Sequence, residues 1–415
     1  MNSHSRLVAL AAAALVCAVG AEVAAQGSAG SVADSPRIIA IERVPSAAWW
    51  DRGALARLPE LGADPTDPWA MDLRSYDVAG IDMRGSLNAV LRASFDSKTV
   101  WPDPGAMPAG FDPAKVMELG RNPGLGVQAL HDRGITGRGV GIAIIDQPLL
   151  TTHEEYADRL LLYEEVNVND RCEAQMHGSA VASIAVGKTA GVAPEADLYY
   201  IATWTVDWDV EDEDDRWNFA YKARAIDRIL ELNVQLPLAR RIRVISISAG
   251  WSPNRRGYEE ITAAVRRATD AGVLVVSSSI EETHGLAFHG LGREPYSDPD
   301  DHSSYRPGSW WAQGFYDGRR MGERLLVPMD SRTTASPTGD SDYVFYRSGG
   351  WSWAIPYIAG LYALAAQVEP TIDPELFWET ATRTGRTISI DRDGTTYELG
   401  PIVDPPALIE ALETP

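Results

Sequence analysis

The stretch GWSWAIPYIAG, from Gly350 to Gly360, predicts a helix whose first turn carries a serine. Ser352 is followed by an apolar run, Ala354 to Gln367, that is compatible with a helix. Pro356 falls in the first turn of that run, where a missing N–H group costs nothing. A helix that begins near Ser352 points free N–H groups and its positive dipole end at the serine oxygen. Two interpretations are open: an acyl-transfer nucleophile, beside which negative charge develops, or a buried helix with a serine N-cap.

The composition is that of a large, acidic globular protein. The chain has 415 residues, 45% of them hydrophobic, which is enough for a sizeable core in one large domain with a smaller addition, or in two domains. The formal net charge of −21 argues against nucleic acid or an anionic membrane as a partner.

Residues 1–25 are typical of a secretion signal. Arg6 supplies the positive charge, Leu7 to Gly20 is an apolar run too short to span a bilayer, and Val23 to Ala25 offers a cleavage site. The alternative is an N-terminal membrane anchor. The signal predicts a secreted or periplasmic protein that has no membrane partner after cleavage.

The cysteines exclude a disulfide framework in the mature chain. Cys17 lies inside the signal, so only Cys172 remains after cleavage and no internal disulfide can form. Cys172 lies five residues before His177, but it lacks the turn chemistry of a nucleophile. Stability therefore has to come from the core, and structural calcium is a second candidate source.

The chain divides after the signal. Residues 26–118 contain a linker, a β-like run (Arg37 to Val44) and an amphipathic helical run (Gly85 to Phe95), punctuated by proline and aspartate. This segment is either a pro-domain removed on activation or a retained wrap around the catalytic domain, and its lack of a compact α/β pattern favours the wrap. Residues 119–415 then form one domain.

This second segment alternates buried strands with helices, which is typical of a parallel α/β sheet. The predicted strands are Val140 to Ile145, Leu198 to Ala202, Ile242 to Ser248, Gly272 to Ser277 and Tyr343 to Tyr346. The predicted helices are His177 to Gly187, Trp217 to Leu232, Tyr258 to Ala271, Ser352 to Val368 and Pro374 to Thr384.

Three separated segments in this region point to one reaction. GRGVGIAIIDQ ends a strand in Asp146, HGSAVASIAVG begins a helix with His177, and GWSWAIPYIAG carries Ser352. In this order they resemble the subtilisin-like serine peptidases, and the resemblance covers roughly residues 120–412. It implies a three-layer α/β fold with a central, mostly parallel sheet flanked by helices. A capping aspartate, a core histidine and an N-cap serine are the separate alternatives, but their joint occurrence favours the family.

The chemistry requires these residue types. Ser352 needs a base as it attacks a carbonyl, and His177 can accept its proton and return it to the leaving amine. Asp146 would hold the other ring nitrogen and stabilise the imidazolium. The resemblance therefore predicts a secreted serine endopeptidase that cleaves polypeptides through an acyl-enzyme on Ser352 and needs no cofactor for the chemistry. The alternative is a catalytically weakened relative that binds peptides or a partner.

The substrate would pair with a segment of small residues. Ser248, Ala249 and Gly250 resemble the family segment that adds an extended substrate as a strand and forms one wall of the first specificity pocket. Their small size predicts an open pocket. The sequence leaves the cleavage preference and the oligomeric state open.

Two residues depart from the family pattern. Glu281, or Glu282 in an alignment shifted by one residue, stands where an asparagine usually donates to the oxyanion, and the loss of such a donor costs about 3 kcal/mol. Three hypotheses are open: Glu281 is protonated and donates, as an aspartic acid does in the related sedolisins; His284 or a serine in the range Ser277 to Ser279 substitutes; or the protein is a degenerate relative. The second departure is Trp351, where a threonine is usual.

Two groups of polar residues suggest ion binding. The acidic run at 207–215 could bind calcium or attract basic substrates, although a solvated loop is favoured and the spacing is not that of an EF-hand. The long insertion at 285–324 holds several candidate ligands and many aromatic residues, which also suit an aromatic lid over the cleft. No metal-ligand spacing fits these candidates, which are His289, Asp298, Asp300, Asp301 and His302.

Overall fold

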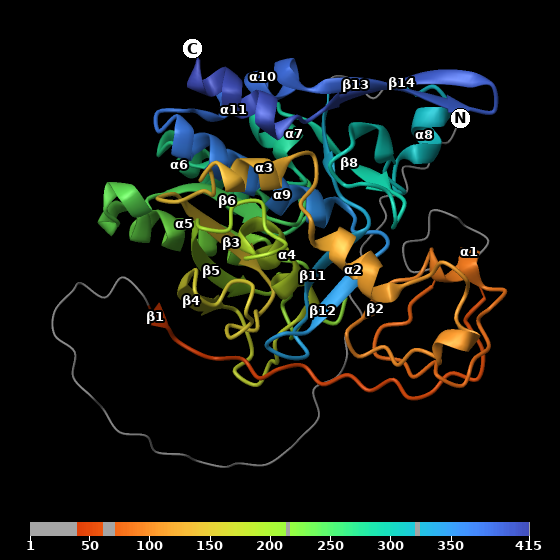
Figure 1. Ribbon diagram of the computed structural model, residues 1–415. Helices are drawn as coiled ribbons and strands as arrows, with labels where there is room; N and C mark the ends of the chain where they lie inside the picture. Colours follow the sequence, from red (N-terminus) through yellow and green to blue (C-terminus); the bar gives the residue numbers. More distant parts are fainter. Residues whose placement is uncertain (1–39, 61–70, 213–215, 320–323, 415) are drawn as a thin grey trace, which may run out of the picture.

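The computed structural model describes residues 40–60, 71–212, 216–319 and 324–414, and a six-stranded sheet forms their centre (Figure 1). All neighbouring strands in this sheet are parallel. In spatial order the strands are β1 (Ala40–Ile41), β4 (Leu160–Val166), β5 (Asp197–Thr203), β3 (Gly141–Asp146), β6 (Ile242–Ile247) and β7 (Leu274–Ser277). The predicted α/β class is confirmed.

Helices cover both faces of this sheet. Ile142 and Ile144 of β3 pack into one core with α4 (Met176–Val186) and α9 (Trp351–Val368). Their neighbours Ala143 and Ile145 pack into a second core with α5 (Ala220–Gln235) and α6 (Tyr258–Asp270). Because side chains alternate along a strand, β3 must be apolar throughout to serve both cores. This explains why its sequence reads as one continuous apolar run.

Two further sheets flank this three-layer core (Figure 1). The five-stranded sheet has the order β13 (Arg386–Arg392), β14 (Thr395–Ile402), β10 (Leu325–Pro328), β8 (Phe288–Arg293) and β9 (Tyr305–Pro307). The three-stranded sheet consists of β11 (Arg332–Ala335), β12 (Tyr343–Tyr346) and β2 (Phe95–Asp96). The remaining helices are α1 (Leu87–Val90), α2 (Pro113–Arg121), α3 (Val127–Asp132), α7 (Ile280–His284), α8 (Ala312–Tyr316), α10 (Pro374–Thr384) and α11 (Pro405–Glu413), with short 3₁₀ turns at 104–106, 238–240 and 302–304.

The N-terminal segment differs from its sequence-based prediction. In the described part of the β-like run Arg37 to Val44, which begins at residue 40, only the two residues of β1 form a strand. The helical run Gly85 to Phe95 contains only the four residues of α1. The helix cannot continue, because Phe95 pairs with Phe345 of β12. The described residues between 40 and 118 are here called the N-terminal unit. This unit nevertheless has a small hydrophobic core of its own, which also includes Phe345 of β12.

Several elements of the fold were not predicted from the sequence. Strand β4, the hairpin β13–β14 and helix α11 were not predicted. The presumed insertion 285–324 contributes β8, β9 and α8, so it is part of the five-stranded sheet. Residues 1–25, predicted as a signal, lie outside the described residues. Within the described ranges, no helix combines the length and apolar character needed to cross a membrane.

Phe345 joins the N-terminal unit to the three-stranded sheet, with its ring centroid 5.2 Å from that of Phe95. It is 1% exposed. We expect Phe345→Ala to lower the free energy of unfolding by about 3–5 kcal/mol, because removal of the large side chain leaves a cavity between the N-terminal unit and the three-stranded sheet. Urea unfolding measures this, with Leu376→Ala at a 44% exposed position as the control. A loss below about 1 kcal/mol would show that the two units are not packed as described.

Candidate active site

A histidine and an aspartate meet at the carboxyl edge of the central sheet. Asp146 is the last residue of β3, and His177 is the second residue of α4. His177 Nδ1 lies 2.7 Å from Asp146 Oδ1, which also accepts the backbone N–H of Gln147 at 2.8 Å. Asp146 is only 4% exposed. The contact therefore orients the imidazole and leaves Nε2 on the other side of the ring.

Gly178 allows α4 to approach the end of β3 this closely. A Cβ atom at this position would lie 2.5 Å from the hydroxyl oxygen of Tyr200 and closer still to the carbonyl oxygen of Gln147. Tyr200 Oη itself donates to the Gln147 carbonyl at 2.5 Å. No side chain larger than hydrogen fits between helix and strand, so the glycine after His177 sets the distance from His177 to Asp146.

Ser352 is the second residue of α9 and is 8% exposed. Gly350 precedes the helix with φ 66°, a left-handed conformation that favours glycine. Trp353 donates its N–H to the Gly350 carbonyl at 3.1 Å, so the first turn begins there. The N–H group of Ser352 lies in this turn, where helical backbones have no internal acceptor. The start of α9 is thus a polarised site for negative charge.

The three predicted catalytic residues are brought to one region. The ring of Trp353, next to Ser352, lies edge-on to the His177 ring with centroids 5.5 Å apart. Both Ser352 and His177 are described, and no hydrogen bond joins their side chains. The contact of Trp353 with His177 was not predicted, because in the sequence Trp353 is one residue of an apolar run.

The predicted substrate segment lies against the same helix. Ser248 Oγ donates to the Ser352 carbonyl at 3.0 Å, directly after β6. Ala249 accepts the N–H of Ser278 at 3.0 Å, so the segment is anchored to the residues after β7. Ser248 and Ala249 are half-buried, and Gly250 is exposed. The segment is therefore accessible to an extended peptide.

Glu281 is engaged by an arginine. Its carboxylate lies on α7, 55% exposed, with Oε2 2.8 Å from Arg324 Nη1 and Oε1 accepting from Nη2 at 3.1 Å. Both oxygens accept in this fork, so the arrangement leaves no O–H group to donate. The structure gives the hypothesis of a protonated, donating Glu281 no support.

Three of the other proposed donors, His284, Ser277 and Ser279, have hydrogen-bond partners elsewhere, and the fourth, Ser278, is half-buried. His284 contacts the hydroxyls of Thr283 and Thr269 at 2.9 and 3.3 Å. Ser279 Oγ donates to the Trp251 carbonyl at 3.0 Å and accepts its N–H at 2.9 Å. Ser277 Oγ accepts the Ser279 N–H at 3.2 Å and is fully buried. None of these contacts directs a donor toward Ser352.

Lys222 is a further charged group near the site. It lies in the first turn of α5 and is 6% exposed. Burial lowers the pKa of Lys222, and the negative charge of Asp146 acts in the opposite direction. The sequence places Lys222 in an amphipathic helix and gives no sign that it faces the interior.

An aromatic layer packs beside Ser352. The His289 ring stacks on Trp311 with centroids 4.6 Å apart, and Trp351 lies at 5.6 Å. Trp351, the departure from the family threonine, is 39% exposed. Burial and the charge of Arg324 together lower the pKa of His289 to about 4, against the opposing charge of Glu281.

The candidate ion ligands do not gather. In the described part of the chain no group of three His, Cys, Asp or Glu side chains is placed to hold a metal. Asp207 is bound by Arg256 at 2.8 Å, and Asp300 by Asn122 at 2.8 Å. Residues 213–215 of the acidic run lie outside the described residues, so calcium binding stays a prediction.

Comparisons with known proteins show which family the chain resembles. The model of the Subtilase family matches residues 137–316. The predicted family resemblance is confirmed. The matched segment contains Asp146 and His177 and ends before Ser352. Among curated proteins, "Subtilisin-like protease PopC" of Myxococcus xanthus (strain DK1622) is 23% identical over 261 residues, which cover 58% of this chain and 54% of that protein. The chain therefore matches about half the length of this relative.

A solved structure is also similar to this chain. "Structure of Prenylagaramide maturation protease PagA" matches with a TM-score of 0.46 and 17% identity. The match covers 69% of this chain and 98% of that one.

A substitution at Gly178 tests whether this glycine allows the close approach of α4 to β3. Gly178→Ala should lengthen the contact between His177 and Asp146, because the methyl group displaces α4 from β3. We expect labelling by a fluorophosphonate serine probe to slow by about 10-fold or more and the free energy of unfolding to fall by about 1–3 kcal/mol. Gly85→Ala, where a Cβ atom meets no neighbour, is the control. Unchanged labelling would disprove this role of Gly178.

The depressed pKa of His289 predicts a pH dependence of stability. Below the ordinary histidine value of about 6.5, the unfolded chain binds a proton that the folded protein, with its pKa of about 4, does not. Stability should therefore fall as the pH drops from 7 to 4, by about 3 kcal/mol for this residue. His289→Phe should remove this contribution, as measured by urea unfolding at both pH values. Equal losses in the wild type and the variant would contradict it.

Proposed function

We propose that this protein is a secreted, subtilisin-like serine endopeptidase. Ser352 Oγ attacks the carbonyl carbon of a peptide bond while His177 Nε2 takes its proton. The tetrahedral adduct then expels the amine, which receives that proton from His177, and leaves an acyl group on Ser352. Water attacks the ester by the same proton transfers in reverse order and frees the carboxylic acid. Asp146 stabilises the imidazolium and fixes its tautomer.

One observation carries the proposal: the hydrogen bond between His177 and Asp146 lies beside a helix whose second residue is Ser352. At 2.7 Å this contact has the length of a charge-assisted bond. The contact of Trp353 with the His177 ring ties the start of α9 to the same point. The family match supports serine peptidase chemistry for the segment that holds two of the three residues.

The oxyanion would lie at the start of α9. The backbone N–H of Ser352 is one donor, and the helix dipole adds to it. Because Glu281 is held by Arg324, we propose that the ion pair takes the place of the family asparagine and that its net charge near zero avoids repulsion of the oxyanion. The substrate would pair with residues 248–250 as an added strand.

The rest of the chain is assigned accordingly. We propose that residues 1–25 are removed as a signal, that residues 26–118 stay as a wrap, and that residues 119–415 carry the catalysis. The retained wrap is supported by β1, which pairs with β4, and by Arg43, whose Nη2 lies 2.6 Å from Glu165 Oε1. Polypeptides are the proposed partners. Calcium, if bound, would be structural.

Labelling by a fluorophosphonate serine probe between about pH 4 and 9 tests the activity. We expect the wild type to be labelled and Ser352→Ala not to be labelled. His177→Ala should be labelled at a rate at least about 10³-fold lower than that of the wild type. Intact mass of the labelled, secreted protein should show a chain that begins near Gln26. Glu281→Gln is the matched variant for the ion pair and should slow labelling by less than about 10-fold.

Two outcomes would count against the proposal. Folded, secreted wild type that is not labelled at any pH would favour the alternative, a weakened relative that binds peptides. Labelling that persists in Ser352→Ala would place the nucleophile elsewhere.

A further inference from the structure

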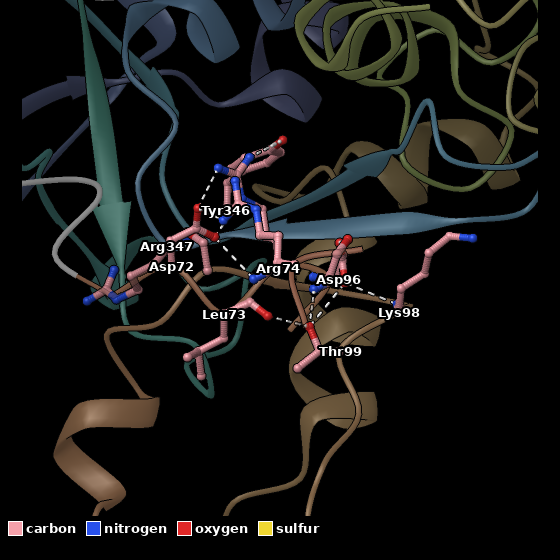
Figure 2. A network of polar contacts seen from close by, with 11 residues as sticks. Asp72, Leu73, Arg74, Asp96, Lys98, Thr99, Tyr346 and Arg347 are labelled. Atoms are coloured by element: carbon pink, nitrogen blue, oxygen red, sulfur yellow. Dashed lines mark hydrogen bonds and ion pairs between the residues drawn. The ribbon is translucent and has the colours of Figure 1, made fainter. Parts of the chain in front are cut away.

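A buried arginine of the N-terminal unit is linked to the candidate site through two aromatic residues. Arg74 is 6% exposed and follows Asp72 by two positions. Its Nε donates to Asp72 Oδ1 and its Nη2 to Oδ2, both at 2.8 Å, which is a bidentate fork. Figure 2 shows Arg74 between Asp72 on one side and Tyr346 on the other. A buried charge needs such a partner, so this geometry is tightly determined.

Arg74 contacts the end of β12 in two ways. Its Nη1 donates to Tyr346 Oη at 3.2 Å, and its guanidinium lies 5.4 Å from the centroid of the Tyr346 ring. Tyr346 is fully buried, and burial raises its pKa to about 12, although Arg74 opposes this. The hydroxyl is therefore neutral and accepts from the guanidinium.

The contact continues to the proposed catalytic histidine. The Tyr346 ring lies perpendicular to the Trp353 ring, with centroids 5.1 Å apart. Trp353 in turn lies edge-on to His177 at 5.5 Å. Its indole Nε1 is buried and has no hydrogen-bond partner among the described residues. Packing therefore orients Trp353, and the rings of Tyr346 and His177 are two of the neighbours against which it packs.

We propose that Arg74 is a positioning residue, which acts through Tyr346 and Trp353 to hold His177 and the start of α9 in place. The proposal rests on the proposed peptidase function of this site. It makes the N-terminal unit a working part of the enzyme rather than an inhibitor that must be removed. Each step is a direct contact. The ion pair with Asp72 fixes Arg74, and a hydrogen bond joins Arg74 to Tyr346. Two aromatic contacts then lead from Tyr346 through Trp353 to His177.

The chain contains a matched control for this arginine. Arg84 follows Asp82 by two positions, as Arg74 follows Asp72, and makes the same kind of fork at 2.9 and 2.6 Å. The Arg84 side chain is 69% exposed, whereas that of Arg74 is 8% exposed. The two pairs share their local geometry, but only Arg74 contacts Tyr346.

The test compares Arg74→Met, Tyr346→Phe and Arg84→Met in the full secreted chain. The first measurement is the rate of fluorophosphonate labelling, with kcat and KM on a cleaved peptide where one is found. We expect Arg74→Met to slow labelling about 10-fold or more, Tyr346→Phe to slow it less, and Arg84→Met to stay within about 2-fold. The loss should fall on kcat, with KM nearly unchanged, because the substrate segment is intact.

A second measurement separates positioning from mere destabilisation. The low-field proton resonance of His177 Nδ1–H, identified by its absence in His177→Ala, reports the bond to Asp146. We expect it to shift or broaden in Arg74→Met and to match the wild type in Arg84→Met. If Arg74→Met does not fold, Tyr346→Phe and Arg74→Lys carry the same test, with the lysine variant restoring charge but not the fork.

The outcomes distinguish this inference from the proposed function. If the wild type is labelled on Ser352 and both Arg74→Met and Tyr346→Phe match it in rate and resonance, Arg74 has no positioning role. If the wild type is not labelled, the peptidase proposal fails, and the His177 resonance alone still decides whether Arg74 orients that ring.

Discussion

The hydrogen bond between His177 and Asp146 is the contact on which the site depends. It requires the end of a central strand to meet the start of a helix that covers the sheet. That meeting is possible because Gly178 has no side chain at the point of closest approach. The bond is also protected from solvent, since Asp146 is 4% exposed. A short bond to a buried carboxylate holds an imidazole in one orientation, which a general base requires.

The rest of the fold supports this contact from several directions. Helices α4 and α9 share one core above β3, so His177 and Ser352 start from a common rigid layer. Ser248, after β6, hydrogen-bonds to the Ser352 carbonyl at 3.0 Å and brings the substrate segment to the same place. The aromatic contact of Trp353 with Tyr346 extends this layer to the three-stranded sheet, where the N-terminal unit packs. The N-terminal unit therefore packs against the same layer that holds His177 and Ser352.

Much of this arrangement could be predicted from the sequence, because parallel strands and amphipathic helices have strong local patterns. The strand that ends in Asp146 and the helices that begin near His177 and Ser352 are of this kind. Contacts between distant segments have no such pattern. The pairing of Phe95 with Phe345 ends a predicted helix, and only the folded chain shows it. The ion pair of Glu281 with a residue 43 positions away follows the same rule.

In the proposed mechanism, His177 activates Ser352 and the start of α9 receives the oxyanion. A crystal structure of the protein after reaction with a fluorophosphonate tests it most directly. We expect phosphorus covalently bonded to Ser352 Oγ and a phosphoryl oxygen within hydrogen-bond distance of the Ser352 N–H. We also expect His177 Nδ1 to remain hydrogen-bonded to Asp146. Phosphorus on another residue, or a phosphoryl oxygen turned away from the start of α9, would contradict the account.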